Sequence, residues 1–243
     1  PVELAELTAT VNEMLAGLEE SFVRLTAFSS DIAHELRTPV TNLLTQTQVT
    51  LAKERSAGEY GDVLASNAEE LERLSRMIAD MLFLARADND LVVPRQEPLD
   101  LLDEVKGLFA FYEALAEEKS IVLICSGSGR VAGDRLMLRR AISNLLSNAL
   151  RHTPVGGQIS VYVDDTGDAG VRLSVENSGE TIALEHLPRL FDRFYRVDSS
   201  RQRASDGAGL GLAITRSIMR AHGGDAIIRS QRGITVCELH FPP

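Results

Sequence analysis

The chain has 243 residues, enough for one large domain or two modest ones, and 44% of them are hydrophobic, which suffices for packed cores. Its formal net charge of −10 argues against a nucleic-acid-binding protein, because such binding depends on neutralising phosphate charge. Cys125 and Cys237 lie in strand-like apolar segments without pairing or metal-ligand spacing, which indicates buried, reduced thiols. The sequence has no signal peptide and no apolar run of roughly 18 residues, so we expect the chain as given to be soluble.

Apolar residues recur at helical spacing through the first third of the chain. Over residues 1–20 the spacing is heptad-like, which predicts either a helix that pairs with another helix or a simple amphipathic helix. The pattern continues to Thr50, is interrupted by a predicted turn at Lys53–Tyr60, and resumes from Leu64 to Ala85. Two long helices with a short connection form an antiparallel hairpin. Because one hairpin cannot cover both of its apolar faces, we expect a homodimer in which two hairpins form a four-helix bundle.

The first helix contains the segment 28–40, with the sequence FSSDIAHELRTPV. Phe28, Ile32 and Leu36 recur every four positions and form an apolar stripe, which leaves His34 on the solvent side of the helix. Pro39 removes one helical hydrogen bond just past this point, so we expect a bend there.

His34 is followed directly by Glu35, and an exposed imidazole beside a carboxylate is a nucleophile with a base at hand. A zinc-protease helix would need a second histidine four positions after the first, where this chain has Thr38, so that metal site is excluded. On these residues alone, His34 is either a phosphoryl acceptor or an ordinary surface histidine.

The periodicity changes beyond a linker predicted at Ala87–Pro98. We predict helices at Leu99–Glu118, Arg135–Arg151 and Leu210–His222, and strands at Ile121–Cys125, Gln158–Asp164, Val171–Glu176, Asp225–Arg229 and Ile234–Phe241. Interleaved helices and strands with an antiparallel C-terminal pair indicate an α/β sandwich, a mixed sheet with helices on one face.

Two asparagines share one face of the helix that ends near residue 152. Asn144 and Asn148 are four positions apart, and Arg151 and His152 follow one turn later. An amide oxygen is a hard ligand suited to Mg²⁺, and it adds no negative charge beside a triphosphate. Arg151 could meet phosphate as a planar donor. The alternative is that both asparagines satisfy backbone groups, although asparagine is a poor helix former and two on one face need a reason.

Three later segments are weak signals individually. Asn177–Thr181 follows a predicted strand and would usually be a generic turn. The segment Leu190–Arg196 contains Phe191 and Phe194 and precedes a polar stretch that we predict to be a flexible lid. The glycine-rich run 207–212 precedes a helix, an arrangement that lets amide N–H groups approach phosphate but disfavours a Rossmann turn.

The contiguous segment 28–40, which ends in Arg-Thr-Pro, resembles the H-box of the sensor histidine kinases of two-component signalling. Within that family the chain is similar to the copper/silver and heavy-metal sensor kinases over nearly its whole length. The resemblance implies that His34 accepts a phosphoryl group from ATP, with Glu35 as general base, and passes it to an Asp of a response regulator receiver domain. It also implies that Thr38 orients water for a reverse phosphatase activity.

The resemblance extends to the later segments. The run around Asn148 is similar to the N-box, in which this residue would hold Mg²⁺, and Asn144, Arg151 and His152 would line the nucleotide site. Phe191 and Phe194 lie in a run similar to the F-box, and Gly207, Gly209, Leu210, Gly211 and Leu212 lie in one similar to the phosphate-binding G2 box.

The turn after residue 176 is similar to the G1 box but departs from its pattern. Asn177 stands where the family has the Asp that receives the adenine amino group, and Thr181 replaces the second glycine, whereas Gly179 is kept. An asparagine oxygen still accepts a hydrogen bond, but without charge assistance we expect adenine binding to be roughly 1–2 kcal/mol weaker.

The resemblance implies three parts: residues 1–20 as the C-terminal helix of a HAMP linker, 21–90 as the dimerising phosphotransfer hairpin, and 95–243 as an ATP-binding domain of the GHKL (Bergerat) type. The natural protein would then extend N-terminally through a membrane. Two alternatives remain open. A GHKL ATPase of the chaperone or topoisomerase kind would share the nucleotide fold but leave the His34 helix unexplained. A dimeric scaffold with a degenerate nucleotide pocket is supported only by Asn177 and Thr181.

Overall fold

The computed structural model describes residues 2–197 and 208–243, with only the backbone described for several residues early in the first helix, Phe28 among them. The chain divides into two compact units, one that extends to Ile78 and one that starts at Ala79. Among the described helices, none combines the length and apolar character needed to cross a membrane.

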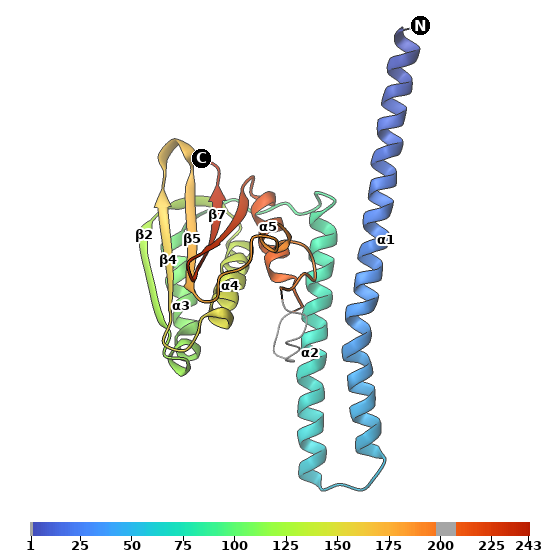
Figure 1. Ribbon diagram of the computed structural model, residues 1–243, viewed down its shortest axis with the longest axis vertical. Helices are drawn as coiled ribbons and strands as arrows, with labels where there is room; N and C mark the ends of the chain where they lie inside the picture. The colour runs from blue at the N-terminus through green and yellow to red at the C-terminus, as the bar shows by residue number, and fades with distance from the viewer. Residues whose placement is uncertain (1, 198–207) are drawn as a thin grey trace. The chain divides into compact units, whose positions relative to one another are not determined.

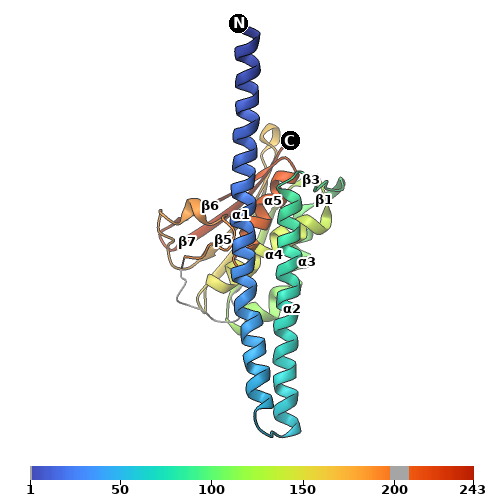
Figure 2. The ribbon, with the colours of Figure 1, turned by 90° about the vertical axis from the view of Figure 1, so that its right-hand side faces the viewer.

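The first unit is a helical hairpin, as predicted. Helix α1 spans Val2–Leu51 and helix α2 spans Ala57–Ala87; Figure 2 shows the C-terminal part of α1 and the first part of α2 side by side. Asn67 of α2 donates a hydrogen bond from Nδ2 to Oγ1 of Thr47 of α1, at 3.3 Å. Helix α1 continues through Pro39 without interruption, although its axis changes direction gently toward its C-terminal end (Figure 1).

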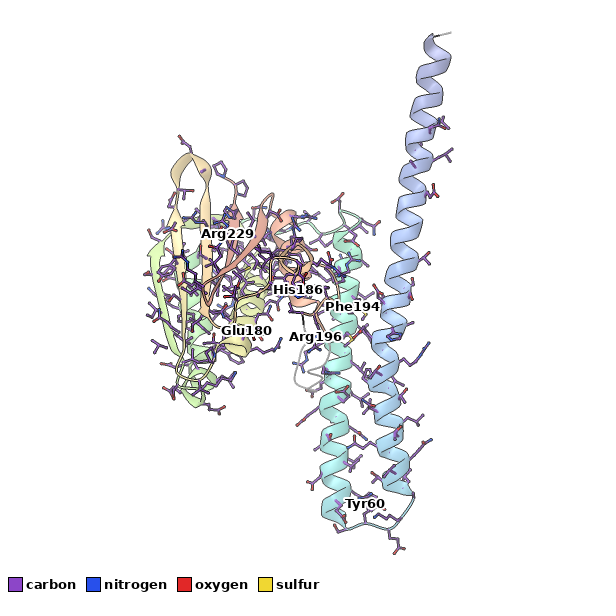
Figure 3. The ribbon with its side chains drawn as sticks, in the orientation of Figure 1. Tyr60, Glu180, His186, Phe194, Arg196 and Arg229 are labelled. Carbon is purple, nitrogen blue, oxygen red and sulfur yellow. The ribbon has the colours of Figure 1, made fainter. Side chains whose placement is uncertain are left out.

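The predicted turn at Lys53–Tyr60 is wrong in its second half, because α2 already begins at Ala57. The cause is a capping box that the sequence reading missed. The backbone N and Oγ of Ser56 donate to Oε2 of Glu59 at 2.8 and 2.9 Å, and the backbone N of Glu59 donates back to Oγ of Ser56 at 3.3 Å. Gly58 therefore lies inside the helix, and Tyr60 projects from its first turns (Figure 3).

The hairpin buries one stripe of α2 and leaves another exposed. Leu74 and Met77 are buried, whereas Leu64, Leu71 and Ile78 are 68%, 57% and 45% exposed. The three exposed residues are seven positions apart, which is the spacing of a helix-pairing seam. A single chain leaves this seam uncovered.

The second unit contains the predicted mixed sheet with helices on one face. Five strands lie in the order β2-β4-β5-β7-β6, with β2 and β4 parallel and the other neighbours antiparallel. The strands are β2 (Val122–Ser128), β4 (Gln158–Asp165), β5 (Val171–Ser178), β6 (Asp225–Gln231) and β7 (Ile234–Phe241). Figure 1 shows α3 (Leu101–Glu118), α4 (Arg135–His152) and α5 (Gly211–Ala221) on the same side of this sheet.

The core lies between that face and the helices because strand residues alternate between the two faces of a sheet. The fully buried side chains include, from the strands, Ile159, Val161, Val163, Leu173 and Leu239, and, from the helices, Leu138, Ile142, Leu146, Ile214 and Ile218.

A second, two-stranded sheet was not predicted. Strand β1 (Glu97–Asp100) pairs antiparallel with β3 (Arg130–Gly133), so the helix predicted from Leu99 begins two residues later, at Leu101. Asp100 fixes this start, because its Oδ1 accepts from the backbone N of Leu102 and Asp103 at 3.1 and 3.3 Å. Two 3-10 turns, Gly167–Ala169 and Leu187–Arg189, complete the described elements.

The division between the two compact units falls inside α2, between Ile78 and Ala79. The last turns of α2 pack within the second unit, where Met81 and Leu84 are buried. Asp80 forms an ion pair with Arg140 of α4, and the Arg140 guanidinium lies 4.7 Å from the ring centroid of Phe83.

Candidate functional site

The histidine segment lies on one turn of α1. His34 and Thr38 are exposed and Glu35 is partly exposed, so the predicted solvent-facing position of His34 is confirmed. Pro39 has no N–H to donate to the carbonyl of Glu35, which leaves that acceptor without its usual helical partner. The segment thus presents an accessible imidazole next to a carboxylate, with a hydroxyl one turn away.

In the second unit, α4 carries the predicted amide pair. Nδ2 of Asn144 donates to the backbone carbonyl of Gly211 at 3.0 Å, which joins this face of α4 to the start of α5. Arg151 donates to Oδ1 of Asn148 at 3.4 Å, and His152 is exposed at the end of the helix. The structure therefore brings together two of the predicted segments, the amide pair and the glycine-rich run.

The turn after β5 lies directly against the C-terminal end of α4. A Cβ added to Gly179 would lie 2.7 Å from the backbone carbonyl oxygen of His152, a distance that side chains do not tolerate. The backbone N of Gly179 donates to the carbonyl of Gly233 at 2.9 Å. Only glycine fits this position, and the close approach brings the third predicted segment to the same place.

Asn177, the penultimate residue of β5, is buried, with 8% of its surface exposed. Its Nδ2 donates to the backbone carbonyl of Ser178 at 3.1 Å, so Oδ1 is the atom left to accept a hydrogen bond from a ligand. This orientation suits the amino group of adenine.

Thr181 has a structural role of its own. The backbone N of Gly233, in the turn between β6 and β7, donates to Oγ1 of Thr181 at 2.8 Å. One position later, the backbone N of Ile182 donates to Oγ of Ser230 at 2.9 Å. The residue that departs from the family pattern therefore fastens the segment after β5 to the sheet.

The two predicted phenylalanines contact α5 and the residues before it. The guanidinium of Arg216 in α5 lies 5.1 Å from the ring centroid of Phe191. Phe194, labelled in Figure 3, has a φ of 60° and donates from its backbone N to the carbonyl of Gly209 at 3.1 Å. Gly209 also has a positive φ, and a Cβ there would lie 2.9 Å from the Phe194 backbone. Gly207, like most of the predicted lid, lies outside the described residues.

Helix α5 begins with backbone N–H groups that no side chain caps. The N-cap residue, Leu210, is buried and has no polar side chain to accept a hydrogen bond from the first amides. The first two helical residues are Gly211, which has no Cβ, and the partly exposed Leu212. Amides at a helix N-terminus bind anions because their N–H groups and the helix dipole both favour negative charge.

The sequence reading missed one ion pair next to the site. Nε and Nη2 of Arg216 donate to the two carboxylate oxygens of Asp225 at 2.8 and 3.1 Å. These hydrogen bonds lower the pKa of the Asp225 carboxyl, and Arg220 adds to the effect. A cation and an acid nine positions apart, on a helix and a strand, give no local signal.

These groups fit ATP with Mg²⁺. Asn177 offers an acceptor for adenine, α5 offers amides for phosphate, and Asn148 offers an uncharged oxygen for the metal. Within residues 2–197 and 208–243, no group of three or more His, Cys, Asp or Glu side chains could hold a metal ion. Ligands beyond Asn148 would therefore include phosphate oxygens and water.

Two protein families match the chain. Residues 24–90 match the His Kinase A (phospho-acceptor) domain, and residues 133–243 match the histidine kinase-, DNA gyrase B-, and HSP90-like ATPase family. The first match covers the helices that the ATPase alternative leaves unexplained.

Curated relatives are sensor kinases. Sensor histidine kinase CusS of Escherichia coli strain K12 is 54% identical over 231 residues, 95% of this chain and 48% of that protein. The probable sensor kinase SilS of Salmonella typhimurium is 47% identical over 247 residues, 100% of this chain and 50% of that protein. The sensor protein CzcS of Cupriavidus metallidurans is 40% identical over 243 residues, 100% of this chain and 51% of that protein. The chain thus spans about half the length of the curated relatives it matches.

Solved structures share the fold. The histidine kinase AdeS of Acinetobacter baumannii has a TM-score of 0.71 at 22% identity and covers 86% of this chain and 97% of that chain. The histidine kinase ThkA, solved in complex with the response regulator protein TrrA, has a TM-score of 0.73 at 22% identity and covers 92% of this chain and 63% of that chain. With both family matches and the identity to CusS and SilS, the chain belongs to the sensor histidine kinases, in the group of the heavy-metal sensor kinases.

Proposed function

We propose that this chain is the kinase core of a two-component sensor and that it phosphorylates His34 from ATP. The observation that carries the proposal is the exposed His34 beside Glu35. The second unit of the same chain offers Oδ1 of Asn177 as an acceptor for adenine, the uncapped first amides of α5 for phosphate and Oδ1 of Asn148 for a metal ion. Nε2 of His34 forms the new N–P bond with the γ-phosphorus as the bond to the ADP oxygen breaks. Glu35 holds the Nδ1 proton and removes it from the resulting imidazolium.

The nucleotide is held by groups of the second unit. Oδ1 of Asn177 accepts from the adenine amino group, and the first amides of α5, at Gly211 and Leu212, receive phosphate oxygens. Arg151 and His152 would meet the same phosphates; their exposure at the end of α4 supports this role. Mg²⁺ bound at Asn148 would neutralise charge that develops on the transferred phosphoryl group.

The phosphoryl group on His34 then passes to an Asp of a response regulator receiver domain. ThkA, which shares this fold, has been solved with such a regulator, and this supports the same kind of partner here. Thr38 lies one turn after His34, is exposed, and is placed to orient water for the reverse phosphatase step.

The exposed seam of α2 supports pairing of two hairpins as a homodimer, and the match to the phospho-acceptor domain supports the same assembly. In the whole protein, residues 1–20 would end a HAMP linker, 21–90 form the phosphotransfer hairpin, and 95–243 bind ATP. A membrane anchor and a response to metal ions are proposed for that protein from the sensor kinases that the chain matches.

The chemical stability of protein-bound phosphate tests the proposal. After incubation with [γ-³²P]ATP and Mg²⁺, the chain should carry label that is lost in acid and retained in alkali, as a phosphoimidazole is. Release of inorganic phosphate with no label on the chain would favour an ATPase of the chaperone or topoisomerase kind. Absence of heat on titration with an ATP analogue and Mg²⁺ would favour a scaffold.

A further inference from the structure

Helices α4 and α5 carry the groups proposed to hold the nucleotide, and they are joined at both ends of their contact. At the nucleotide end, Asn144 donates to the carbonyl of Gly211 at 3.0 Å. At the far end, the backbone N of Asp134, the N-cap of α4, donates to Nε2 of His222, the C-cap of α5, at 3.0 Å. The helices are therefore antiparallel, with one cross-link at each end.

The two cross-links enclose nearly equal lengths of helix. Asp134 and Asn144 are ten positions apart and Gly211 and His222 eleven, which corresponds to about 15 Å of α4 and about 16 Å of α5. Between them, Oγ1 of Thr215 lies 3.5 Å from the carbonyl oxygen of Ala141, but its single proton has a nearer acceptor in its own helix, the carbonyl of Gly211 at 2.9 Å. The register therefore depends mainly on the two end cross-links. Sliding one helix along the other would break the bond to His222 as well as the bond at Asn144, because each end has a single cross-link among the described hydrogen bonds.

The protonation state of the His222 ring follows from its partners. A backbone N–H can only donate, so Nε2 must be an acceptor and the ring proton lies on Nδ1. Nδ1 lies 2.8 Å from the carbonyl of Ile218, one turn earlier in α5, and donates to it. Nδ1 therefore donates a hydrogen bond within α5, whereas Nε2 accepts one from α4.

The surroundings are built to admit this ring. A Cβ on Gly133 would lie 2.8 Å from Cδ1 of Leu138 and 2.9 and 3.1 Å from Cδ2 and Nε2 of His222, so a side chain at this position would require the ring or Leu138 to shift. The Asp134 carboxylate is used separately, because its oxygens accept from the backbone N of Leu136, Met137 and Arg95. The His222 bond thus engages the backbone N–H of the residue whose side chain caps the start of α4.

We propose that His222 is a positioning residue for the nucleotide site, acting through the bond from Asp134. It sets the register of α4 against α5, and so the position of Asn148, one turn after the Asn144–Gly211 bond, relative to the N-terminal amides of α5. The inference rests on the proposed function, since it assumes that these two helices share one nucleotide.

Two substitutions distinguish the role of the hydrogen bond at Nε2 from that of the hydrogen bond at Nδ1. In His222→Gln, Oε1 is three bonds from Cβ, as Nε2 is in histidine, and can still accept from the backbone N of Asp134. In His222→Asn, Nδ2 is two bonds from Cβ, as Nδ1 is, so the bond to Ile218 is kept and the bond to Asp134 is lost. Both variants place an amide at the end of α5, so they are matched in polarity and charge.

The measurement is the KM for ATP and the kcat of autophosphorylation for the whole chain, with the unfolding temperature of each variant. His222→Asn should raise KM about five- to tenfold with a smaller change in kcat, because one hydrogen bond that fixes the binding geometry is lost. His222→Gln should restore KM to within about twofold of the original chain.

The opposite order, with His222→Gln impaired and His222→Asn normal, would show that only the bond to Ile218 matters and would overturn the inference. Equal KM values for both variants would overturn it as well. If the unsubstituted chain neither binds nor uses ATP, the proposed function fails, and this result is distinct from any difference between the variants.

Discussion

The turn after β5 is the part of the site most constrained by single side chains. Asn177 is buried with its amide nitrogen engaged, and Gly179 lies against the carbonyl of His152. The sequence predicted both residues as nucleotide ligands through a family resemblance. It could not predict the contact with His152, because that contact joins positions 27 residues apart through tertiary packing.

Gly179→Ala should destabilise the second unit by about 1–3 kcal/mol, because the added Cβ meets a backbone oxygen that cannot move aside easily. The measurement is denaturant unfolding of the chain. Gly107→Ala is the matched control, since Gly107 lies in α3 and its Cβ would meet only the flexible end of Arg139 at 3.3 Å. The control should be neutral or stabilised by up to about 1 kcal/mol. Equal destabilisation of both variants would contradict the steric explanation.

Asn177→Leu should weaken binding of an ATP analogue about tenfold, because it keeps the branched shape of the side chain and removes the acceptor for adenine. A GTP analogue, which offers a carbonyl in place of the amino group, should bind equally weakly to both proteins. Isothermal titration with each analogue and Mg²⁺ provides the comparison. If the ratio of the affinities for the ATP and GTP analogues is the same in Asn177→Leu as in the original chain, Asn177 does not recognise adenine.

The secondary structure elements could be predicted where the apolar pattern repeats over many residues. They could not be predicted where a short segment adopts its structure only by pairing with a distant part of the chain. The hairpin and the five strands of the larger sheet were predicted, with shifts at their ends. Strands β1 and β3 were missed because each has four residues and is defined by its partner across the sheet. The start of α2 was readable, since Ser56 and Glu59 form a capping box, but the nearby glycines favoured a turn.

The junction of α5 and β6 gives a pH-dependent prediction. Arg216 lowers the pKa of Asp225 from its ordinary value of 3.8, so the ionised form is favoured in the folded chain. This stabilisation is complete above the ordinary pKa and is lost as the pH falls through the lowered pKa. Asp225→Asn should therefore reduce the free energy of unfolding at pH 7 by about 1 kcal/mol or less, because solvent screens a partly exposed pair.

The difference between Asp225→Asn and the original chain should shrink as the pH is lowered below about 4. Unfolding free energies measured across this range provide the comparison, with Asp168→Asn on the exposed turn before β5 as the control. A difference that stays constant down to the lowest pH would show that the carboxylate charge does not stabilise the junction.

The whole chain consists of two compact units that share α2, and its first unit leaves an apolar seam exposed. The seam supports the proposed pairing of two hairpins, which the sequence predicts because one hairpin cannot cover both of its apolar faces. The boundary between the compact units lies inside a continuous helix, and the ion pair of Asp80 with Arg140 joins the end of that helix to the second unit.

Leu71→Glu should convert the dimer into monomers, because a charge at the centre of the seam cannot be buried against a second copy without a partner. Sedimentation velocity measures the change in mass. Glu72→Gln, at the next position of the same helix and also exposed, should remain a dimer. A dimeric Leu71→Glu chain would mean that the copies pair through another surface.

The most direct test of phosphoryl transfer to the first unit is retention of label from [γ-³²P]ATP by three proteins compared side by side. The original chain and His240→Gln, which changes a histidine of β7, should both become labelled. His34→Gln should bind the ATP analogue with unchanged affinity and carry no label, since the imidazole that accepts the phosphoryl group is replaced and the groups proposed to hold the nucleotide lie in the second unit. Label that persists on His34→Gln at the rate of the original chain would contradict His34 as the acceptor.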